Sequence, residues 1–440
     1  MAANSPRTLA ADWVVPVDGA PIENGAVALA DGRIAAVGRL DELGPADERF
    51  DDAVILPGFV NAHSHLEYAV YAGFGDGLPF DRWIVVHIER KRRIGWDDFV
   101  AIARAGAAEC LASGITTVGD ASFSGAAAIA CAELGLRAIV YLEVFGRTTE
   151  ELETRFPRNK GRIEAHLSDR VRLGISPHAP YTCSPELYAA SLELGLPVAT
   201  HLAESRAEEE WMRHGRGAWE PLSELFPPPP GETGIRHLAA HGLLGPSVVA
   251  AHCVTVDDED IGLLAQHDVA VAHCPRSNAI LGCGIAPLRA LLDAGLRVGL
   301  GTDSPASTPS FDVFEELRTA VYAARAREAR PSALSPAEAL ELATLGSARA
   351  LDLDDEVGSL TPGKRADLTV LSLAGSAYLP WEDPATAVVF GGSPDRVLLT
   401  MTDGEPRYRK GGETWPRRRL HSDAASARRR MLALATPAAR

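Results

Sequence analysis

The sequence predicts an α/β protein, in which a (β/α)8 TIM-like barrel is joined to a small β-sandwich domain formed by both chain ends. Near-continuous apolar runs of strand length alternate with Ala-rich helical stretches through the middle of the 440 residues. This alternation is expected of parallel strands that are buried on both faces. Short alternating runs separated by turns lie before and after that region. We expect the barrel to span 57–357, and the small domain to combine 1–56 with 358–440.

The composition excludes several classes of protein. Hydrophobic residues make up 46% and charged residues 23% of the chain, as in ordinary globular proteins. A net charge of −16 argues against nucleic acid or an anionic membrane surface as a partner. No window of about 18 apolar residues predicts a membrane span, and residues 1–20 do not resemble a signal peptide.

The cysteine pattern indicates the compartment. The six cysteines form no Cys-x-x-Cys pair, so we expect reduced thiols and a cytoplasmic location. The expected partner is a small-molecule substrate, with neither nucleic acid nor membrane, and a homodimer is the candidate oligomer.

The two ends of the chain have the same sequence pattern, in which short apolar runs are separated by turns. Residues 8–52 contain short apolar runs, and Asp31-Gly32 between two of them is a hairpin signal. Similar runs return at 366–371 and 396–401. One small β-domain built from both ends explains this pattern.

Eight strand-like runs fill the middle of the chain, and Ala-rich stretches such as 99–112 and 286–294 separate them as crossover helices. The eight runs are 55–65, 116–120, 137–144, 171–175, 198–201, 248–252, 269–273 and 298–303. Eight strands with crossover helices predict the barrel. The sequence FPPPPG at 226–231 marks a surface loop, and the Arg-rich segment 417–430 predicts a terminal helix or a frayed end.

The first barrel strand carries two histidines that can share one target. His63 and His65 are separated by one residue, and side chains at i and i+2 of a strand point to the same side. Two imidazoles aimed at one point are suitable first ligands for a metal ion.

Further polar residues stand at the ends of other predicted strands. A single buried histidine is more often a core residue than a ligand. Because the carboxyl ends of barrel strands converge on one mouth, several such residues together indicate an active site. They are His178, His201, His252, His273 and Asp303.

These residues lie in motifs that resemble the amidohydrolase superfamily. The motifs are PGFVNAHSH at 57–65, THLAE at 200–204, AHC at 251–253, HCPRSN at 273–278 and GTDS at 301–304. The chain is most similar to the mononuclear aminohydrolase branch, which contains adenosine-type, S-adenosylhomocysteine, guanine and aminodeoxyfutalosine deaminases.

The resemblance implies one divalent metal bound by three imidazoles and a carboxylate. This donor set suits Zn²⁺, with Fe²⁺ or Mn²⁺ as alternatives. Members with two metals bridge them with a carboxylated lysine near the third or fourth strand, and no lysine of this chain lies there. The implied ligands are His63, His65, His201 and Asp303.

The resemblance also implies three catalytic roles. Glu204 would give a proton to a ring nitrogen of the substrate while metal-bound hydroxide attacks the amino-bearing ring carbon and ammonia leaves. Asp303 would take the proton of the attacking water, and His252 would orient that water. The alternative interpretation of Glu204 is a solvated carboxylate at a helix start, beside the glutamates at 208–210.

Four residues are candidate substrate contacts. By resemblance, Arg147 and His178 would contact a ribose, although Arg147 could equally be a surface charge. Glu67 and Trp83 belong to a first-loop cover of the pocket, in which Trp83 is a lid or simple packing. The basic cluster RKRR at 90–93 is a solvated helix face or a contact for a substrate carboxylate.

The implied function is hydrolytic deamination of an aminopurine nucleoside. The stretch 65–84 looks most like aminodeoxyfutalosine deaminases of menaquinone biosynthesis, whose substrate is 6-amino-6-deoxyfutalosine. Ser304-Pro305 replaces the Gly-Ala of many relatives, so the resemblance does not predict the shape of the pocket near the eighth strand. The alternatives are a chlorohydrolase-like enzyme or a guanine or pterin deaminase on this scaffold, and an inactive barrel that serves in binding or assembly.

Overall fold

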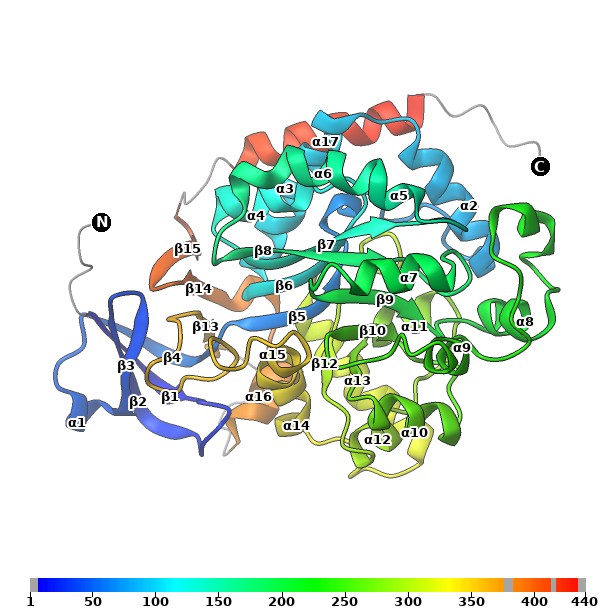
Figure 1. Cartoon of the computed structure of the whole chain (residues 1–440). Helices are drawn as coiled ribbons and strands as arrows, with labels where there is room; N and C mark the ends of the chain where they lie inside the picture. Colours follow the sequence, from blue (N-terminus) through cyan, green and yellow to red (C-terminus); the bar gives the residue numbers. More distant parts are fainter. Residues whose placement is uncertain (1–6, 376–382, 413–416, 434–440) are drawn as a thin grey trace.

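Eight parallel strands form the centre of the molecule (Figure 1). The computed structural model describes residues 7–375, 383–412 and 417–433. The strands pair in sequence order from β5 to β12. Their bounds are β5 Phe59–Ser64, β6 Ile115–Ser122, β7 Arg137–Val144, β8 Val171–Pro177, β9 Val198–Leu202, β10 Val248–His252, β11 Ala270–His273 and β12 Val298–Leu300. All eight predicted strands are confirmed.

The two edge strands of this sheet meet and close the barrel. The backbone amide of Asp303 donates to the carbonyl of His63 (3.0 Å), and Ser64 pairs with Asp303 in an isolated parallel bridge. Every residue of β5, β6 and β7 is buried, which explains why apolar residues predominate in β7 and why the polar residues of all three strands need partners inside the protein.

Helices cover the outside of the barrel, and several begin at side-chain caps. Ser205 accepts the backbone N–H of Glu208 at the start of α8 (Arg206–His214), and Asp257 caps α10 (Asp258–Gln266) in the same way. The longest are α3 (Trp96–Ala112), α13 (Val313–Glu328) and the terminal α17 (Arg417–Ala433). The Arg-rich segment is therefore a helix, which packs beside α3 (Figure 1).

Both chain ends contribute to one separate sheet of mixed direction. Its order is β15-β14-β13-β4-β1-β2-β3, so hydrogen bonds join strands from both chain ends, as expected. The bounds are β1 Arg7–Val14, β2 Ile22–Ala30, β3 Arg33–Arg39, β4 Glu48–Pro57, β13 Leu368–Ser372, β14 Val397–Thr402 and β15 Glu405–Arg409. The expected domain ranges include 1–6, 376–382, 413–416 and 434–440, which lie outside the described residues.

A buried arginine ties the barrel to this sheet. Arg137, the first residue of β7, donates to both carboxylate oxygens of Asp367 (2.9 and 3.2 Å) and to Asp403 (2.7 Å). Arg137 and Asp367 are both almost fully buried. The network joins residues more than 200 positions apart in the chain.

We predict that Arg137→Met lowers the free energy of unfolding by about 3–5 kcal/mol, because Asp367 would keep a buried charge without its partner. Chemical denaturation measures the change. The matched control is Arg104→Met, which breaks the solvent-exposed pair with Glu133 (2.6 Å) and should cost less than about 1 kcal/mol. Equal losses in the two variants would contradict a structural role for the buried network.

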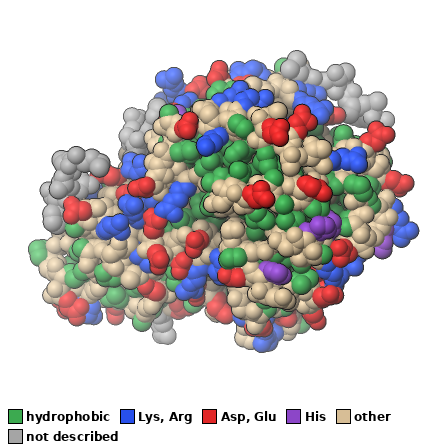
Figure 2. Space-filling view, in the orientation of Figure 1, with side chains coloured by type: hydrophobic (Ala, Val, Ile, Leu, Met, Phe, Trp, Pro, Cys, Tyr) green, Lys and Arg blue, Asp and Glu red, His purple; other side chains and the backbone are tan. Residues whose placement is uncertain are grey.

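The surface carries charges of both signs. In Figure 2, acidic and basic side chains are interspersed over the visible face, and hydrophobic side chains gather near its centre. A polyanion therefore meets no continuous basic patch on this face. Among the described helices, none combines the length and the apolar character needed to traverse a bilayer.

Candidate active site

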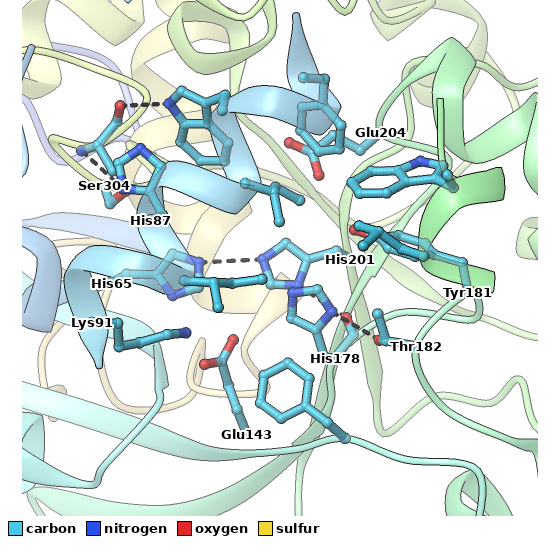
Figure 3. Close-up of a pocket in the computed structure, with 18 of the residues that line it drawn as sticks. His65, His87, Lys91, Glu143, His178, Tyr181, Thr182, His201, Glu204 and Ser304 are labelled. Carbon is cyan, nitrogen blue, oxygen red and sulfur yellow. Dashed lines mark hydrogen bonds between the residues drawn. The ribbon is translucent and has the colours of Figure 1, made fainter. Parts of the chain in front are cut away.

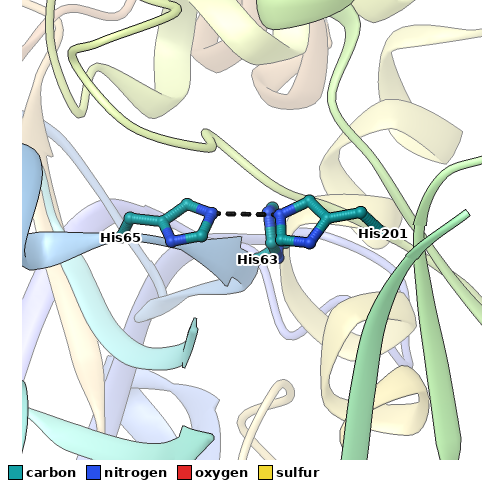
Figure 4. Close-up of side chains that lie close together, drawn as sticks. All are labelled: His63, His65 and His201. Atoms are coloured by element: carbon teal, nitrogen blue, oxygen red, sulfur yellow. Dashed lines mark hydrogen bonds between the residues drawn. The ribbon is translucent and has the colours of Figure 1, made fainter. Parts of the chain in front are cut away.

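Three histidines meet at the carboxyl end of the barrel. His63 lies in β5, His65 directly follows it, and His201 lies in β9. One ring nitrogen from each lies within 4.8 Å of the other two, and the three rings point to a common centre (Figure 4). Asp303, just past β12, brings its Oδ1 atom to 3.5 Å from His65 Nε2 and 3.8 Å from His63 Nε2.

The hydrogen bonds of these histidines indicate that a cation belongs between them. His65 Nδ1 donates to the carbonyl of Ala121 (2.7 Å), and His201 Nδ1 donates to the carbonyl of His178 (3.0 Å). Burial lowers the pKa of both imidazoles, which keeps them neutral. Their Nε2 atoms then carry only lone pairs, yet they lie 3.2 Å apart. Two lone pairs at this distance repel unless both bind a cation.

The remaining donors support the same conclusion. His63 Nε2 is buried and has no hydrogen-bond partner among the described residues. Asp303 Oδ2 accepts from Ser277 Oγ (2.7 Å) and Ser307 Oγ (2.6 Å), which leaves Oδ1 facing the histidines. Three neutral imidazoles and one carboxylate oxygen fit a single divalent metal ion.

Glu204 lies beside this centre, at the turn after β9. It lines the pocket and is 6% exposed, so the alternative of a solvated carboxylate does not fit. The carboxylate of Glu208 holds the turn by accepting the backbone N–H groups of Ala203 (2.9 Å) and Glu204 (2.8 Å). Burial, assisted by the charge of Asp303, raises the pKa of Glu204 well above its ordinary value. The raised pKa favours the protonated form of Glu204, which is the form that could donate a proton.

His252 completes the polar side of the site. Its Nδ1 donates to Asn278 Oδ1 (3.0 Å), so its Nε2 is free to accept a hydrogen bond. That Nε2 atom lies 3.6 Å from Glu204 Oε1. His252 and Asp303 both adopt left-handed backbone conformations, with φ of 76° and 56°. Such conformations are uncommon for non-glycine residues and concentrate at functional sites.

A close contact at Gly301 sets the distance between β5 and β12. A Cβ atom on Gly301 would lie 2.9 Å from Cys274 Sγ and from His63 Cβ, and 3.0 Å from the backbone nitrogen of His63. Asn61 strengthens this junction, because its side chain exchanges hydrogen bonds with Thr302 (2.7 and 2.9 Å). Only glycine lets the two strands approach closely enough for His63 and Asp303 to converge.

We predict that Gly301→Ala reduces the metal content of the dialysed protein and destabilises it by about 1–3 kcal/mol, since the added methyl group overpacks this junction. Metal analysis and thermal unfolding measure the two effects. Gly262→Ala in α10 is the control, because nothing lies within 4 Å of the added Cβ. Normal metal content in the Gly301 variant would contradict the proposed constraint.

Aromatic side chains line a cavity of about 330 Å³ beside His65 and His201 (Figure 3). Trp83 in α2 (Phe80–Lys91) lines this cavity, and its indole N–H donates to the carbonyl of Ala306 (3.2 Å). Phe80 and Tyr181 also line it, and the ring of Tyr181 stacks on that of Trp219 (5.5 Å between centroids). These flat apolar surfaces suit a planar ligand.

Of the four candidate substrate contacts, two lie in the cavity wall and two do not. His178 and Trp83 line the cavity. Glu67 is buried outside it, where its carboxylate accepts from Ser122, Ser124 and the backbone of Ala126 at the start of α4 (Ala126–Leu134). Arg147 is exposed and is not part of the cavity wall.

Two charged residues, Glu143 and Lys91, also line the cavity. The motifs predict no role for Glu143, while Lys91 belongs to the basic cluster 90–93, for which a substrate contact is one of the two interpretations. Glu143 interrupts the apolar strand β7, which is an unusual place for a carboxylate. Lys91 follows Trp83 and His87 at intervals of four residues, so one face of α2 carries all three into the cavity. Both signals are visible in the sequence.

Comparisons with known proteins agree with this geometry. A model of the amidohydrolase family matches residues 54–407. The 5′-deoxyadenosine deaminase of Methanothermobacter thermautotrophicus is 34% identical over 407 residues, which cover 90% of this chain and 92% of that protein. A 5-methylthioadenosine/S-adenosylhomocysteine deaminase of Syntrophobacter fumaroxidans is 35% identical over 408 residues, which cover 88% of this chain and 89% of that protein.

Solved structures show the same architecture. An adenosine deaminase from Xanthomonas campestris with bound zinc superimposes with a TM-score of 0.86 at 27% identity, and covers 97% of this chain and 98% of that one. A triazine hydrolase from Arthrobacter aurescens superimposes with a TM-score of 0.80 at 25% identity, and the match covers 96% of this chain and 99% of that one.

Proposed function

Because this chain belongs to the amidohydrolase family, we propose that it is a metal-dependent hydrolytic deaminase of an aminopurine nucleoside. Its relatives are deaminases, which are hydrolases of carbon–nitrogen bonds in cyclic amidines. The observation that carries the proposal is the position of the buried Glu204, whose pKa is raised by burial, beside three converging histidines and Asp303. Deamination of an aminopurine requires a proton donor next to a nucleophile.

Zn²⁺ is the proposed metal, held by His63, His65, His201 and Asp303, with Fe²⁺ and Mn²⁺ as alternatives. The chemistry that it supplies when bound is activation of a water molecule near neutral pH. The zinc in the structure from Xanthomonas campestris supports this choice. Elemental analysis of protein purified without added metal tests it.

The residues around the metal divide the remaining work. Glu204 gives its proton to the ring nitrogen next to the amino-bearing carbon, which makes that carbon accept the water oxygen. Asp303 takes the proton that the water loses and passes it to the amino group, which leaves as ammonia. His252 accepts a hydrogen bond through Nε2 and thereby orients the attacking water. The hydroxyl group left on the ring carbon returns its proton to Glu204 as ammonia departs, so the product has a carbonyl in place of the amino group and Glu204 is restored.

The narrower proposal concerns the substituent on the sugar. The relatives act on nucleosides that are deoxygenated or thioether-substituted at the 5′ position, by their names. The aromatic side chains of the cavity would also suit the carboxyphenyl group of 6-amino-6-deoxyfutalosine, the substrate suggested by residues 65–84. This substrate remains one member of the proposed class.

The test is a screen for ammonia release from six compounds: adenosine, 5′-deoxyadenosine, methylthioadenosine, S-adenosylhomocysteine, aminodeoxyfutalosine and guanine. We expect turnover of at least one adenine nucleoside with little or none of guanine. Chloride release from a chlorotriazine instead would favour the chlorohydrolase alternative, for which the likeness to a triazine hydrolase is the supporting observation. Less than about one tenth of an equivalent of metal after reconstitution would favour an inactive barrel.

A further inference from the structure

A second polar site lies in the same cavity, on the other side of the His65–His201 pair from Glu204 (Figure 3). It is formed by Glu143 of β7 and Lys91 of α2, whose charged groups point toward one another in that view. Neither residue has a part in the proposed proton transfers. Both are separate from the metal ligands in sequence.

Glu143 presents a carboxylate oxygen without a protein partner. The residue is 3% exposed, and its Oε2 atom accepts no hydrogen bond from the described residues. One of its oxygens lies within 4.8 Å of ring nitrogens of His178 and His201. A buried carboxylate with an unused acceptor is costly unless a ligand supplies the donor.

Lys91 is held in place with donors to spare. Its ammonium group donates to the hydroxyl of Tyr68 (3.0 Å) and lies 3.9 Å from the centre of the Phe123 ring. An ammonium group has three N–H donors. Among the described residues, only the hydroxyl oxygen of Tyr68 accepts a hydrogen bond from Lys91, so two donors remain available to a ligand. The ring of Tyr68 stacks on that of His65, 5.4 Å between centroids, so this site adjoins the metal centre.

The charges of the site select the chemistry of its ligand. Because Lys91 and Glu143 carry opposite charges, a substrate carboxylate bound at Lys91 would also face Glu143, and a second metal ion bound at Glu143 would also face Lys91. Arg155, another cation nearby, already pairs with Glu151 (3.6 Å). A neutral group that donates to Glu143 and accepts from Lys91 satisfies both residues, and a hydroxyl group does this.

We propose that Lys91 and Glu143 bind the vicinal hydroxyl groups of the substrate's sugar and thereby make the enzyme selective for ribonucleosides. This inference rests on the proposed function. It replaces the exposed Arg147 as the sugar contact and leaves His178 as a neighbour of the bound sugar.

The experiment compares adenosine with 2′,3′-dideoxyadenosine in wild type, Glu143→Gln and Lys91→Met. We expect kcat/KM for adenosine to fall about 10- to 100-fold in each variant, because a hydrogen bond to a charged group is lost. For the dideoxynucleoside, which lacks both hydroxyls, the fall should stay below about threefold. Arg92→Met and Glu150→Gln are the controls, since both side chains are exposed and neither lines the cavity.

Calorimetry with the products inosine and 2′,3′-dideoxyinosine gives a readout without turnover. We expect wild type to bind inosine at least tenfold more tightly and both variants to lose that preference. The proposal would be overturned if wild type bound the two products equally or did not bind inosine. Equal losses of kcat/KM for both substrates in a variant would also overturn it. That comparison is made within one variant, so it holds even if the variant folds poorly. Absence of ammonia release in wild type would refute the deaminase function alone. A fall in zinc from two equivalents to one in Glu143→Gln would identify a second metal site instead.

Discussion

Glu204→Gln is expected to retain one equivalent of metal and to lose about three orders of magnitude in kcat. Glutamine has nearly the shape of a protonated glutamic acid, but it cannot transfer a proton to the substrate ring. General acid–base residues typically contribute about 10²- to 10⁴-fold to rate. Glu204 is not one of the four proposed metal ligands, so the metal content measured by elemental analysis should be unchanged while the rate of ammonia release falls.

The control for this variant is Glu210→Gln, which changes an exposed glutamate six residues further along. It should behave as wild type in both measurements. Substrate binding by Glu204→Gln, measured by calorimetry, should change by less than about tenfold, because the substitution preserves the cavity. Near-normal kcat in Glu204→Gln would contradict proton delivery by this residue. Loss of the metal would instead give Glu204 a structural role.

The barrel could be predicted because its strands have a strong physical signature. Strands buried on both faces are mostly apolar, so β7 and β10 stand out from the polar loops around them. The same geometry fixes the ends of the strands. His201, His252 and Asp303 could therefore be predicted to converge before any coordinates were known.

Residues in the loops could not be placed in this way. Glu67 follows the histidine pair closely and has a charge that a ligand could use, but the fold brings Ser122, Ser124 and the start of α4 to it. Arg147 lies next to the cavity residue Gly146, yet the loop turns its side chain to solvent. In both cases the decisive neighbours are distant in sequence, and local patterns carry no information about them.

The small domain shows a different limit. Alternating apolar runs predict strands, and both chain ends supply them as expected. Whether such strands form two sheets or one depends on pairing across long separations, such as β4 with β13 (Leu56 opposite Thr369). The strands of the small domain could therefore be predicted, while the order in which they pair emerges only from the structure.

Asp303→Ala is expected to abolish both metal binding and turnover. The substitution removes one of four ligands together with the group that takes the proton of the attacking water. It also leaves three neutral imidazoles, which bind a divalent cation without any charge compensation. We expect metal below about one tenth of an equivalent after dialysis and a kcat at least about 10⁴-fold below that of wild type.

Thermal unfolding separates this loss of metal from a general loss of structure. A ligand that binds only the folded state raises the melting temperature, so zinc should stabilise wild-type protein stripped with a chelator and restore its activity. Asp303→Ala should unfold near the temperature of stripped wild type and should not respond to zinc. Asp293→Asn, an exposed aspartate of α12 (Leu288–Asp293), is the control and should respond as wild type does. A full equivalent of metal in Asp303→Ala, or a zinc-dependent shift equal to that of wild type, would show that the centre does not need this carboxylate. The convergence of β5, β9 and β12 would then need another explanation than metal binding.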